Sequence, residues 1–317
     1  MMVNSTLSSL PIVLEAYLAL GRWKYLGFVL LLLLYVLTVA SNLLLTAVIC
    51  LSRSLHQPMY VLLCSLFVNE LYGSTALVPF LLLQILSDLH AVSAPFCFLQ
   101  IFCVYTYVNV EFCTLAVMAY DRFVAICQPL QYHLRMSLSR TLLLVFVLWL
   151  YSFLKCLSTL ALSLQLQRCG VAINSLYCHN YLVVKLSCSD TRVNNIYGLL
   201  GIVVSVLVPL VLILFSYLRI LQVCFSGSRQ TRQKAVSTCS PQLVSLLNFA
   251  LTCLLEIVQT RLSLAGLPRM LRNVLSLYFY LLQPLMTPVM FGLQVSAIRS
   301  RCKAVLWPEK LPRRFSK

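Results

Sequence analysis

The sequence predicts an all-α membrane protein, a bundle of seven transmembrane helices. Of its 317 residues, 61% are hydrophobic and only 10% are charged, at a mean hydropathy of +0.91. Water-soluble domains typically have about 25% charged residues, so this chain belongs in a bilayer. A spanning helix needs roughly 20 apolar residues at about 1.5 Å rise each. Seven stretches are long enough, at residues 25–51, 58–86, 96–119, 141–166, 193–218, 235–259 and 273–298.

The first and last stretches carry no charge. Four charged residues lie within the others, namely Glu70, Glu111, Lys155 and Glu256. A charged side chain is costly in lipid, so we expect these four to face the bundle interior or a helix end. The connections are short and leave no room for a separate soluble domain. The chain therefore divides into an outer tail, a seven-helix domain and a basic tail, at residues 1–24, 25–298 and 299–317.

The distribution of Lys and Arg predicts the orientation of the chain. Fifteen lie on the side of the carboxyl tail and eight on the other side. Basic residues favour the cytoplasmic side, so we expect the amino terminus outside and the carboxyl terminus in the cytoplasm. The net charge of +16 favours contact with anionic membrane lipids, and no recognisable module supports a nucleic-acid partner. No cleavable signal precedes the first span, which we expect to act as its own insertion signal.

One glycosylation triplet, Asn4-Ser5-Thr6, lies on the tail that is predicted to be outside. Such triplets also arise by chance, so its position gives modest support for this orientation. We expect Asn4 to carry a glycan on an exposed tail.

The fourteen cysteines fall into two groups. Ten lie in the spans or on the cytoplasmic side, where a cysteine acts as a small hydrophobic residue. Four map to the outer side, namely Cys97, Cys169, Cys178 and Cys188. We expect one bridge from the start of the third span to the following outer loop and a second within that loop, although the sequence allows three pairings. Zinc is the weaker alternative because no CxxC spacing is present.

Glu70 and Glu111 lie near the middle of the second and third spans, too deep to reach water. In one interpretation they approach each other across a polar cavity and share a cation, a proton or water with Asn42. In the other, each is protonated and only hydrogen-bonded, because neighbouring carboxylates in a low dielectric disfavour each other's ionisation. We favour the shared cluster.

Three prolines lie inside the spans, where each removes a backbone donor. Pro79 fits the ordinary tolerance of spanning helices for proline. Pro209 and Pro288 have neighbours that make them candidate hinges.

Six segments carry a family likeness, at Pro58-Met-Tyr60, residues 118–132, residues 185–194, Ser216-Tyr217, residues 234–239 and residues 284–288. The extended block around Asp121-Arg122, joined to the block that begins at Lys234, is the most specific part. Together the segments resemble the vertebrate odorant receptors, a branch of the rhodopsin-like G-protein-coupled receptors, over roughly residues 26–306. In the sixth span, Phe249-Ala250-Leu251 replaces a common Phe-Tyr-Gly and is closer to the fish-type receptors.

The resemblance implies a plasma-membrane receptor that binds a small odorant between the outer halves of its helices. It further implies activation of a heterotrimeric G protein of the stimulatory olfactory type, which raises cyclic AMP. Neither an enzyme activity nor a cofactor is implied.

The resemblance also implies roles for single residues. Arg122 resembles the arginine that Asp121 restrains at rest, and Tyr217 resembles its partner in the active state. The family's two disulfides correspond to the pairs Cys97 with Cys178 and Cys169 with Cys188. Glu70 and Glu111 fall where the family keeps its intramembrane acids.

Three departures from the family pattern bear on activation. Phe123 replaces the tyrosine that usually follows the Asp-Arg pair. In the seventh span, Asn-Pro-x-x-Tyr is replaced by Thr287-Pro288-Val289-Met290-Phe291, so the switch hydroxyl is missing at Phe291. Ala250 removes an aromatic ring from the floor of the pocket. We expect activation to be weaker or to proceed through different contacts.

We predict a ligand pocket from spacing on the third span, where residues at i, i+3 and i+4 share a surface, and from the facing spans. Its predicted lining is Val104, Tyr105, Val108, Asn109, Ile202, Ser205, Cys253, Leu254, Ile257 and Tyr278. No carboxylate lies in the outer half of the third span, which disfavours an amine ligand. Arg261 and Lys185 near the mouth are compatible with an acidic ligand.

Other classes of membrane protein fit less well. A transporter or channel predicts internal repeats or broken helices in matched halves, and neither occurs. An intramembrane hydrolase would need a catalytic triad or metal site on facing spans. A rhodopsin-like receptor outside the odorant class remains the nearest alternative.

Overall fold

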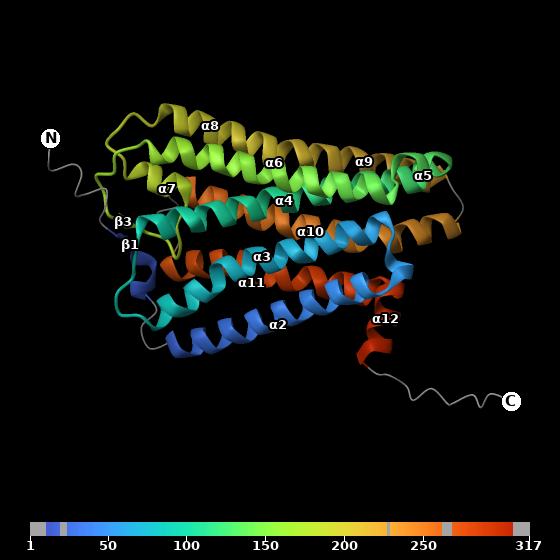
Figure 1. The fold of residues 1–317 in the computed structure, drawn as a ribbon, viewed down its shortest axis with the longest axis horizontal. Helices are drawn as coiled ribbons and strands as arrows, with labels where there is room; N and C mark the ends of the chain where they lie inside the picture. The colour runs from blue at the N-terminus through green and yellow to red at the C-terminus, as the bar shows by residue number, and fades with distance from the viewer. Residues whose placement is uncertain (1–10, 20–23, 227–228, 262–267, 307–317) are drawn as a thin grey trace.

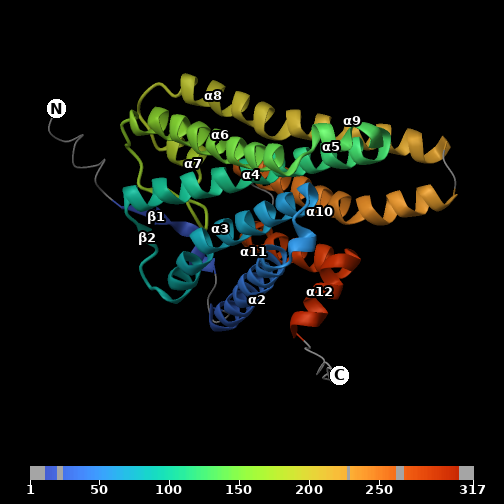
Figure 2. The ribbon, with the colours of Figure 1, turned by 45° about the vertical axis from the view of Figure 1, so that its right-hand side comes forward.

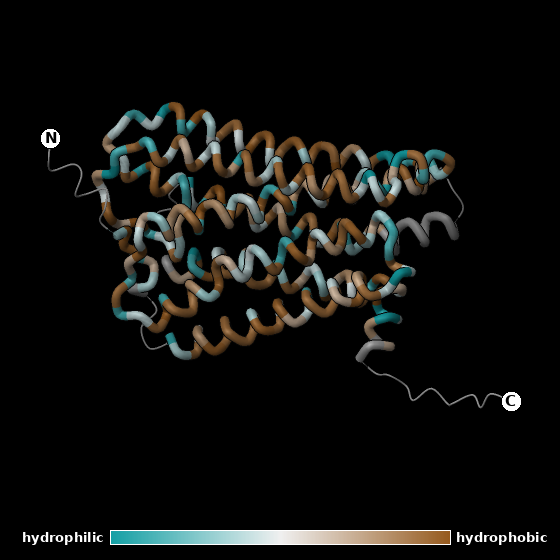
Figure 3. The backbone as a smooth tube through the Cα atoms, in the orientation of Figure 1, coloured by the Kyte–Doolittle hydropathy of each residue, from teal (hydrophilic) through white to brown (hydrophobic). Residues whose placement is uncertain are grey.

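Seven long helices form a single bundle in a computed structural model of the chain, which describes residues 11–19, 24–226, 229–261 and 268–306 (Figure 1). All seven are long and apolar enough to cross a membrane, which confirms the predicted fold class. Hydrophobic residues dominate the middle of the bundle, and hydrophilic residues gather mainly at its two ends (Figure 3).

The spanning helices are α2 (Lys24–Leu51), α3 (Pro58–Leu86), α4 (Ala94–Cys127), α6 (Leu138–Leu164), the continuous run of α8 (Arg192–Ile202), η5 (Val203–Leu207) and α9 (Val208–Ser226), α10 (Arg229–Arg261) and α11 (Arg269–Gln294). The short helices are η1 (Glu15–Ala19), η3 (Arg53–Leu55), η4 (Pro129–Gln131), α5 (Tyr132–Arg135), α7 (Asn180–Lys185) and α12 (Ser296–Leu306). The strands are β1 (Ile12–Leu14), β2 (Ala91–Val92) and β3 (Ala172–Ile173).

The predicted spans differ from the observed helices mainly at their ends. The third helix continues past the predicted end at Ala119 to Cys127, so Asp121 and Arg122 lie inside a helix. The seventh ends at Gln294 rather than at the predicted Ile298, because the chain is extended at Val295 and then turns into α12. Hydropathy marks only the apolar part of a helix, and hydrogen bonding carries the helix into the polar interface.

The fifth spanning helix contains a π-helical turn, η5, which ends two residues before Pro209. Proline has no N–H to donate and crowds the preceding turn, which favours a local change of helical winding. The turn separates α8 from α9 without breaking the helix. The irregular backbone ends at Leu207 and Pro209 itself lies in α9, so the hinge at Pro209 stays a prediction.

Helix α4 lies at the centre of the bundle and contacts α3, α6, α9 and α10 (Figure 1). The buried apolar side chains form two clusters, one toward each end. Fully buried polar residues such as Glu70 and Glu111 also lie inside the bundle. Polar groups in a bilayer must find partners inside the protein, and α3 and α4, which carry these two acids, each contact four other spanning helices.

The chain near its amino terminus forms the middle strand of a small sheet, and we call this end of the bundle the sheet end (Figure 2). β1 pairs antiparallel with β2 and parallel with β3. Ile12 and Leu14 are fully buried, and the Tyr17 hydroxyl donates to the Leu176 carbonyl at 2.8 Å. Burial raises the pKa of Tyr17, so the hydroxyl stays protonated as a donor. The tail was expected to be exposed, but Ile12, Leu14, Ala16 and Tyr17 are buried; Asn4 lies outside the described residues.

Two disulfides fasten the loop between α6 and α8 at the sheet end. Cys97, in the first turn of α4, is joined to Cys178 with 5.4 Å between their Cα atoms. Cys169 is joined to Cys188 within the loop, at a Cα distance of 5.7 Å. The structure thus has the two pairs that the family resemblance implies.

We predict that Cys97→Ser or Cys178→Ser sharply lowers delivery to the cell surface. A cross-link of this kind typically stabilises the folded state by about 2–4 kcal/mol, and its loss also leaves a free thiol. Surface labelling of intact cells measures the effect. Cys302→Ser is the matched control, because Cys302 is a free cysteine; normal surface levels of the Cys97 variant would contradict the prediction.

Candidate functional site

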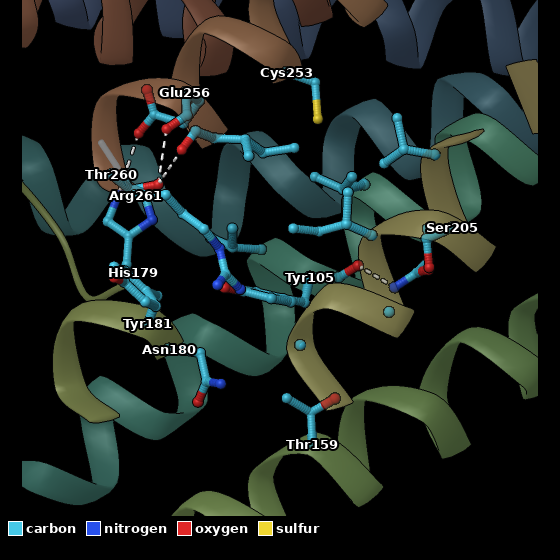
Figure 4. Close-up of a pocket in the computed structure, with 18 of the residues that line it drawn as sticks. Tyr105, Thr159, His179, Asn180, Tyr181, Ser205, Cys253, Glu256, Thr260 and Arg261 are labelled. Carbon is cyan, nitrogen blue, oxygen red and sulfur yellow. Dashed lines mark hydrogen bonds and ion pairs between the residues drawn. The ribbon is translucent and has the colours of Figure 1, made fainter. Parts of the chain in front are cut away.

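A cavity of about 140 Å³ lies in the half of the bundle nearer the sheet end, between α4, α6, α7, α8, η5, α10 and α11 (Figure 4). Eight of the ten predicted pocket residues line it, namely Val104, Tyr105, Val108, Asn109, Ile202, Ser205, Cys253 and Ile257. The i, i+3, i+4 spacing on the third span therefore identified the face of α4 that borders the cavity.

Two predicted pocket residues lie elsewhere. Leu254 is 42% exposed, on the outer face of α10, because it follows Cys253 by one residue and is turned away from the cavity. Tyr278 does not line the cavity, and its hydroxyl donates to Asn248 at 2.7 Å. Both errors come from the rotation of a helix about its axis, which spacing within that helix does not determine.

The cavity also has polar lining residues that the pocket prediction omitted. They include Lys155, Thr159, His179, Asn180, Tyr181, Glu256, Thr260 and Arg261. Charge inside a span was the available signal for Lys155 and Glu256, and it did predict that they face the interior. For His179 and Tyr181 the only signal was their nearness in sequence to Cys178. Lys185, expected near the mouth, is exposed and does not line the cavity.

Glu256 lies on α10 and contacts the loop that covers the cavity. We call this set of contacts the Glu256 latch. Its Oε1 atom lies 3.2 Å from His179 Nε2 and accepts from the Tyr177 hydroxyl at 2.5 Å. Ser276 on α11 donates to both carboxylate oxygens, at 3.2 and 3.0 Å. Burial, and then the Glu256 charge, raise the pKa of Tyr177, so this hydroxyl remains a donor. Figure 4 shows Glu256 beside His179.

Glu70 and Glu111 are fully buried in the interior and interact with each other, as predicted, and each also has partners that were not predicted. Glu70 accepts from the Tyr107 hydroxyl and from Thr287 Oγ1, each at 2.9 Å. Glu111 accepts from Asn69 Nδ2 at 2.9 Å.

Asn42 does not bind either acid. Its amide donates to the Thr38 and Pro284 carbonyls, each at 2.9 Å. The Pro284 carbonyl is a ready acceptor because Pro288, four residues on, has no N–H to donate to it. Including Asn42 in the acid cluster was therefore wrong.

At the opposite end of the bundle, Asp121 is buried and accepts from two side chains. Arg122 Nε donates to it at 3.0 Å and the Tyr132 hydroxyl at 2.9 Å. Burial first, and then the Asp121 charge, raise the pKa of Tyr132, which keeps its hydroxyl protonated. The Tyr217 hydroxyl is buried and has no hydrogen-bond partner in the described part of the chain. The arginine is thus held by its neighbour and not by Tyr217.

Phe291 is buried at the same end of the bundle as Tyr217, within one apolar cluster. Thr287, which stands where the family usually has asparagine, donates to Glu70 just before Pro288. The seventh helix is therefore tied to the acid cluster through a hydroxyl. Among the described residues, no group of three or more His, Cys, Asp or Glu side chains could hold a metal ion.

A family model described as "Olfactory receptor" matches residues 31–309 of the chain. The human protein named Olfactory receptor 2A12 is 34% identical over 281 residues, covering 88% of this chain and 90% of its own length. Human Olfactory receptor 10A3 is 33% identical over 282 residues, or 88% of each chain. Human Olfactory receptor 10A6 is 32% identical over 288 residues, or 90% of each chain.

We predict that Glu256→Gln lowers the midpoint of thermal unfolding of the detergent-solubilised protein. The amide still accepts hydrogen bonds but loses its charge beside His179, a change expected to cost about 1–3 kcal/mol. Glu15→Gln is the matched control, because Glu15 is exposed. Equal midpoints for the two variants would show that the Glu256 latch does not stabilise the fold.

Proposed function

The chain belongs to the olfactory receptor family, and from this premise we propose that its cavity near the sheet end is the odorant site. As a member of this family it is an odorant receptor, a multi-pass protein of the plasma membrane and not an enzyme. The observation that carries the proposal is the cavity itself, which five of the spanning helices border and which the disulfide-bonded loop covers.

We propose that the sheet end faces the outside and that α12 faces the cytoplasm. Three features support this orientation: the excess of Lys and Arg on the side of the carboxyl tail, the disulfides at the sheet end, and the Asn4 triplet, which precedes β1 in the sequence. In this orientation residues 1–24 form the outer segment, 25–298 the receptor domain and 299–317 the basic tail that meets anionic lipids.

We propose that Asp121 and Arg122 form the coupling switch for a stimulatory olfactory G protein. Releasing the arginine from Asp121 would free it for the unpartnered hydroxyl of Tyr217, which gives the two states that a switch requires. Pro288 and Phe291 would transmit the change along α11. This role is supported by the bond from Thr287, the residue before Pro288, to Glu70.

We propose that Glu70 and Glu111 share a proton or a cation and so bias the resting state. Both carboxyls are fully buried, and they are close enough for their charges to interact. Glu111 Oε1 has no hydrogen-bond donor among the described residues, which leaves room for a shared ligand.

We also propose the fish-type affiliation within the family. It rests on Phe249-Ala250-Leu251 in the sixth span, where Ala250 stands in place of an aromatic ring. The small side chain is buried beside Phe249 in the apolar cluster at the sheet end.

The decisive experiment co-expresses the receptor with an olfactory G protein and measures cyclic AMP against panels of volatile and water-soluble odorants.

We predict that Asp121→Asn raises basal cyclic AMP because it removes the charge that restrains Arg122. We further predict that Arg122→Ala abolishes coupling yet reaches the surface.

Surface labelling is measured beside cyclic AMP in every variant. If both residues only secure the helix end, both variants lose surface expression and neither gains basal activity. An Arg122→Ala receptor that signals normally rules out the proposed switch.

A further inference from the structure

We propose that the ligand of the cavity is a small organic acid, whose carboxylate is bound by Lys155, Arg261 and Ser205. We call these three residues the cationic cradle. The inference rests on the proposed odorant site and names the chemical class that the site selects.

Lys155 brings a positive charge into the cavity without an acid to neutralise it. Its Nζ atom donates to Asn109 Oδ1 at 3.1 Å and to the Gly201 carbonyl at 3.0 Å, and both acceptors are neutral. No Asp or Glu of the described residues forms an ion pair with it. A cation inside a spanning helix is costly unless an anion offsets it, so an anionic ligand would lower its energy.

Arg261 comes from a different helix and approaches the same face of α8. A Cβ atom built on Gly198 would lie 3.0 Å from Arg261 Nη2, and one on Gly201 would lie 3.9 Å from Lys155 Nζ. Residues three apart on a helix lie on one surface, with Cβ atoms about 5–6 Å apart. The two cationic groups therefore converge within about one helical turn, on a strip of α8 that glycine keeps open.

Ser205 supplies a third donor on the same face, four residues beyond Gly201. It lies in the π-helical turn η5, lines the cavity and is only 5% exposed. Its hydroxyl has no hydrogen-bond partner in the described part of the protein. Buried hydroxyls are nearly always hydrogen-bonded, so an unpartnered one that borders a cavity indicates a ligand atom.

The carboxylate of Glu256, which lines the cavity, does not compete with the ligand for these cations. Glu256 is the only Asp or Glu among the lining residues, and the Glu256 latch already occupies both of its oxygens. Arg261 instead stacks over the Tyr181 ring, with 4.5 Å from the guanidinium carbon to the ring centroid. An amine would meet two uncompensated positive charges.

The rest of the lining fits the hydrocarbon part of an acid. It includes Val104, Val108, Ile202, Val206, Ile257 and Phe279. A cavity of about 140 Å³ admits only a small molecule, so the ligand combines one carboxylate with a short aliphatic or aromatic body.

The test compares butanoic, hexanoic, octanoic and phenylacetic acids with the methyl ester and the primary alcohol of each. Dose responses of cyclic AMP are measured in cells that express the parent, Lys155→Met, Lys155→Arg, Ser205→Ala or the control Lys185→Met. We expect at least one acid to act at concentrations about tenfold or more below its ester and alcohol. Lys155→Met should raise the half-maximal concentration of that acid by about tenfold or more, because it removes one partner of a buried charge pair.

The variants separate recognition of the carboxylate from a role in folding. Lys155→Arg keeps the charge and should retain part of the preference for the acid, whereas Lys185→Met should match the parent. Equal losses for acid, ester and alcohol in a surface-expressed Lys155→Met receptor would overturn the proposal. If that variant does not reach the surface, an unchanged acid response in Ser205→Ala overturns it and a weakened one supports it.

A binding measurement distinguishes two failures. One is that the cationic cradle does not bind a carboxylate, and the other is that the receptor does not couple to the proposed G protein. The midpoint of thermal unfolding of the solubilised receptor is measured with each acid and its ester. Stabilisation by an acid in the parent but not in Lys155→Met, without a cyclic AMP response, supports the cationic cradle and contradicts the proposed coupling. Equal stabilisation by acid and ester overturns the cradle, whatever the cyclic AMP assay gives.

Discussion

A polar group inside a bilayer has no water to bind, so it must find its partner within the bundle. This constraint explains where the described polar side chains lie. Glu70 and Glu111 take hydroxyl and amide donors from neighbouring helices, and Glu256 takes donors from a loop and from α11. Each contact fixes the rotation of one helix against another, which apolar packing alone leaves loosely determined because lipid is as apolar as leucine.

The same constraint makes the remaining unpaired groups informative. Where the protein satisfies a buried charge completely, as at Glu256, the group stabilises the closed loop. Among the described residues, Lys155 has only neutral acceptors and the hydroxyls of Ser205 and Tyr217 have no partner, and we propose that a ligand or another state supplies what is missing. The two kinds of unpaired group lie at different levels of the bundle, Ser205 at the cavity and Tyr217 toward the Arg122 end.

Much of this arrangement could be predicted from the sequence, because it follows from hydropathy and from helical spacing. The seven spans and the cavity-facing side of α4 depend only on residues close together in the chain. Leu254, Tyr278 and Asn42 were assigned wrongly because their surroundings depend on how helices are turned against distant partners. The π-helical turn that presents Ser205 and the strand at Ile12–Leu14 gave no periodic signal, since both are shorter than the window in which periodicity is measurable.

The position of β1 also constrains the order in which the protein is assembled. Its residues leave the ribosome before the spanning helices, yet β3 lies far along the chain, and the Tyr17 hydroxyl bonds to a carbonyl 159 residues away. Contacts between such distant segments form slowly because a long loop must close first. Pairing of β1 with β2 becomes possible after the second spanning helix, whereas pairing with β3 must wait until the first four spanning helices are made. Closure of the sheet is then a late step of biosynthesis, reached only after the loop that follows α6 has emerged.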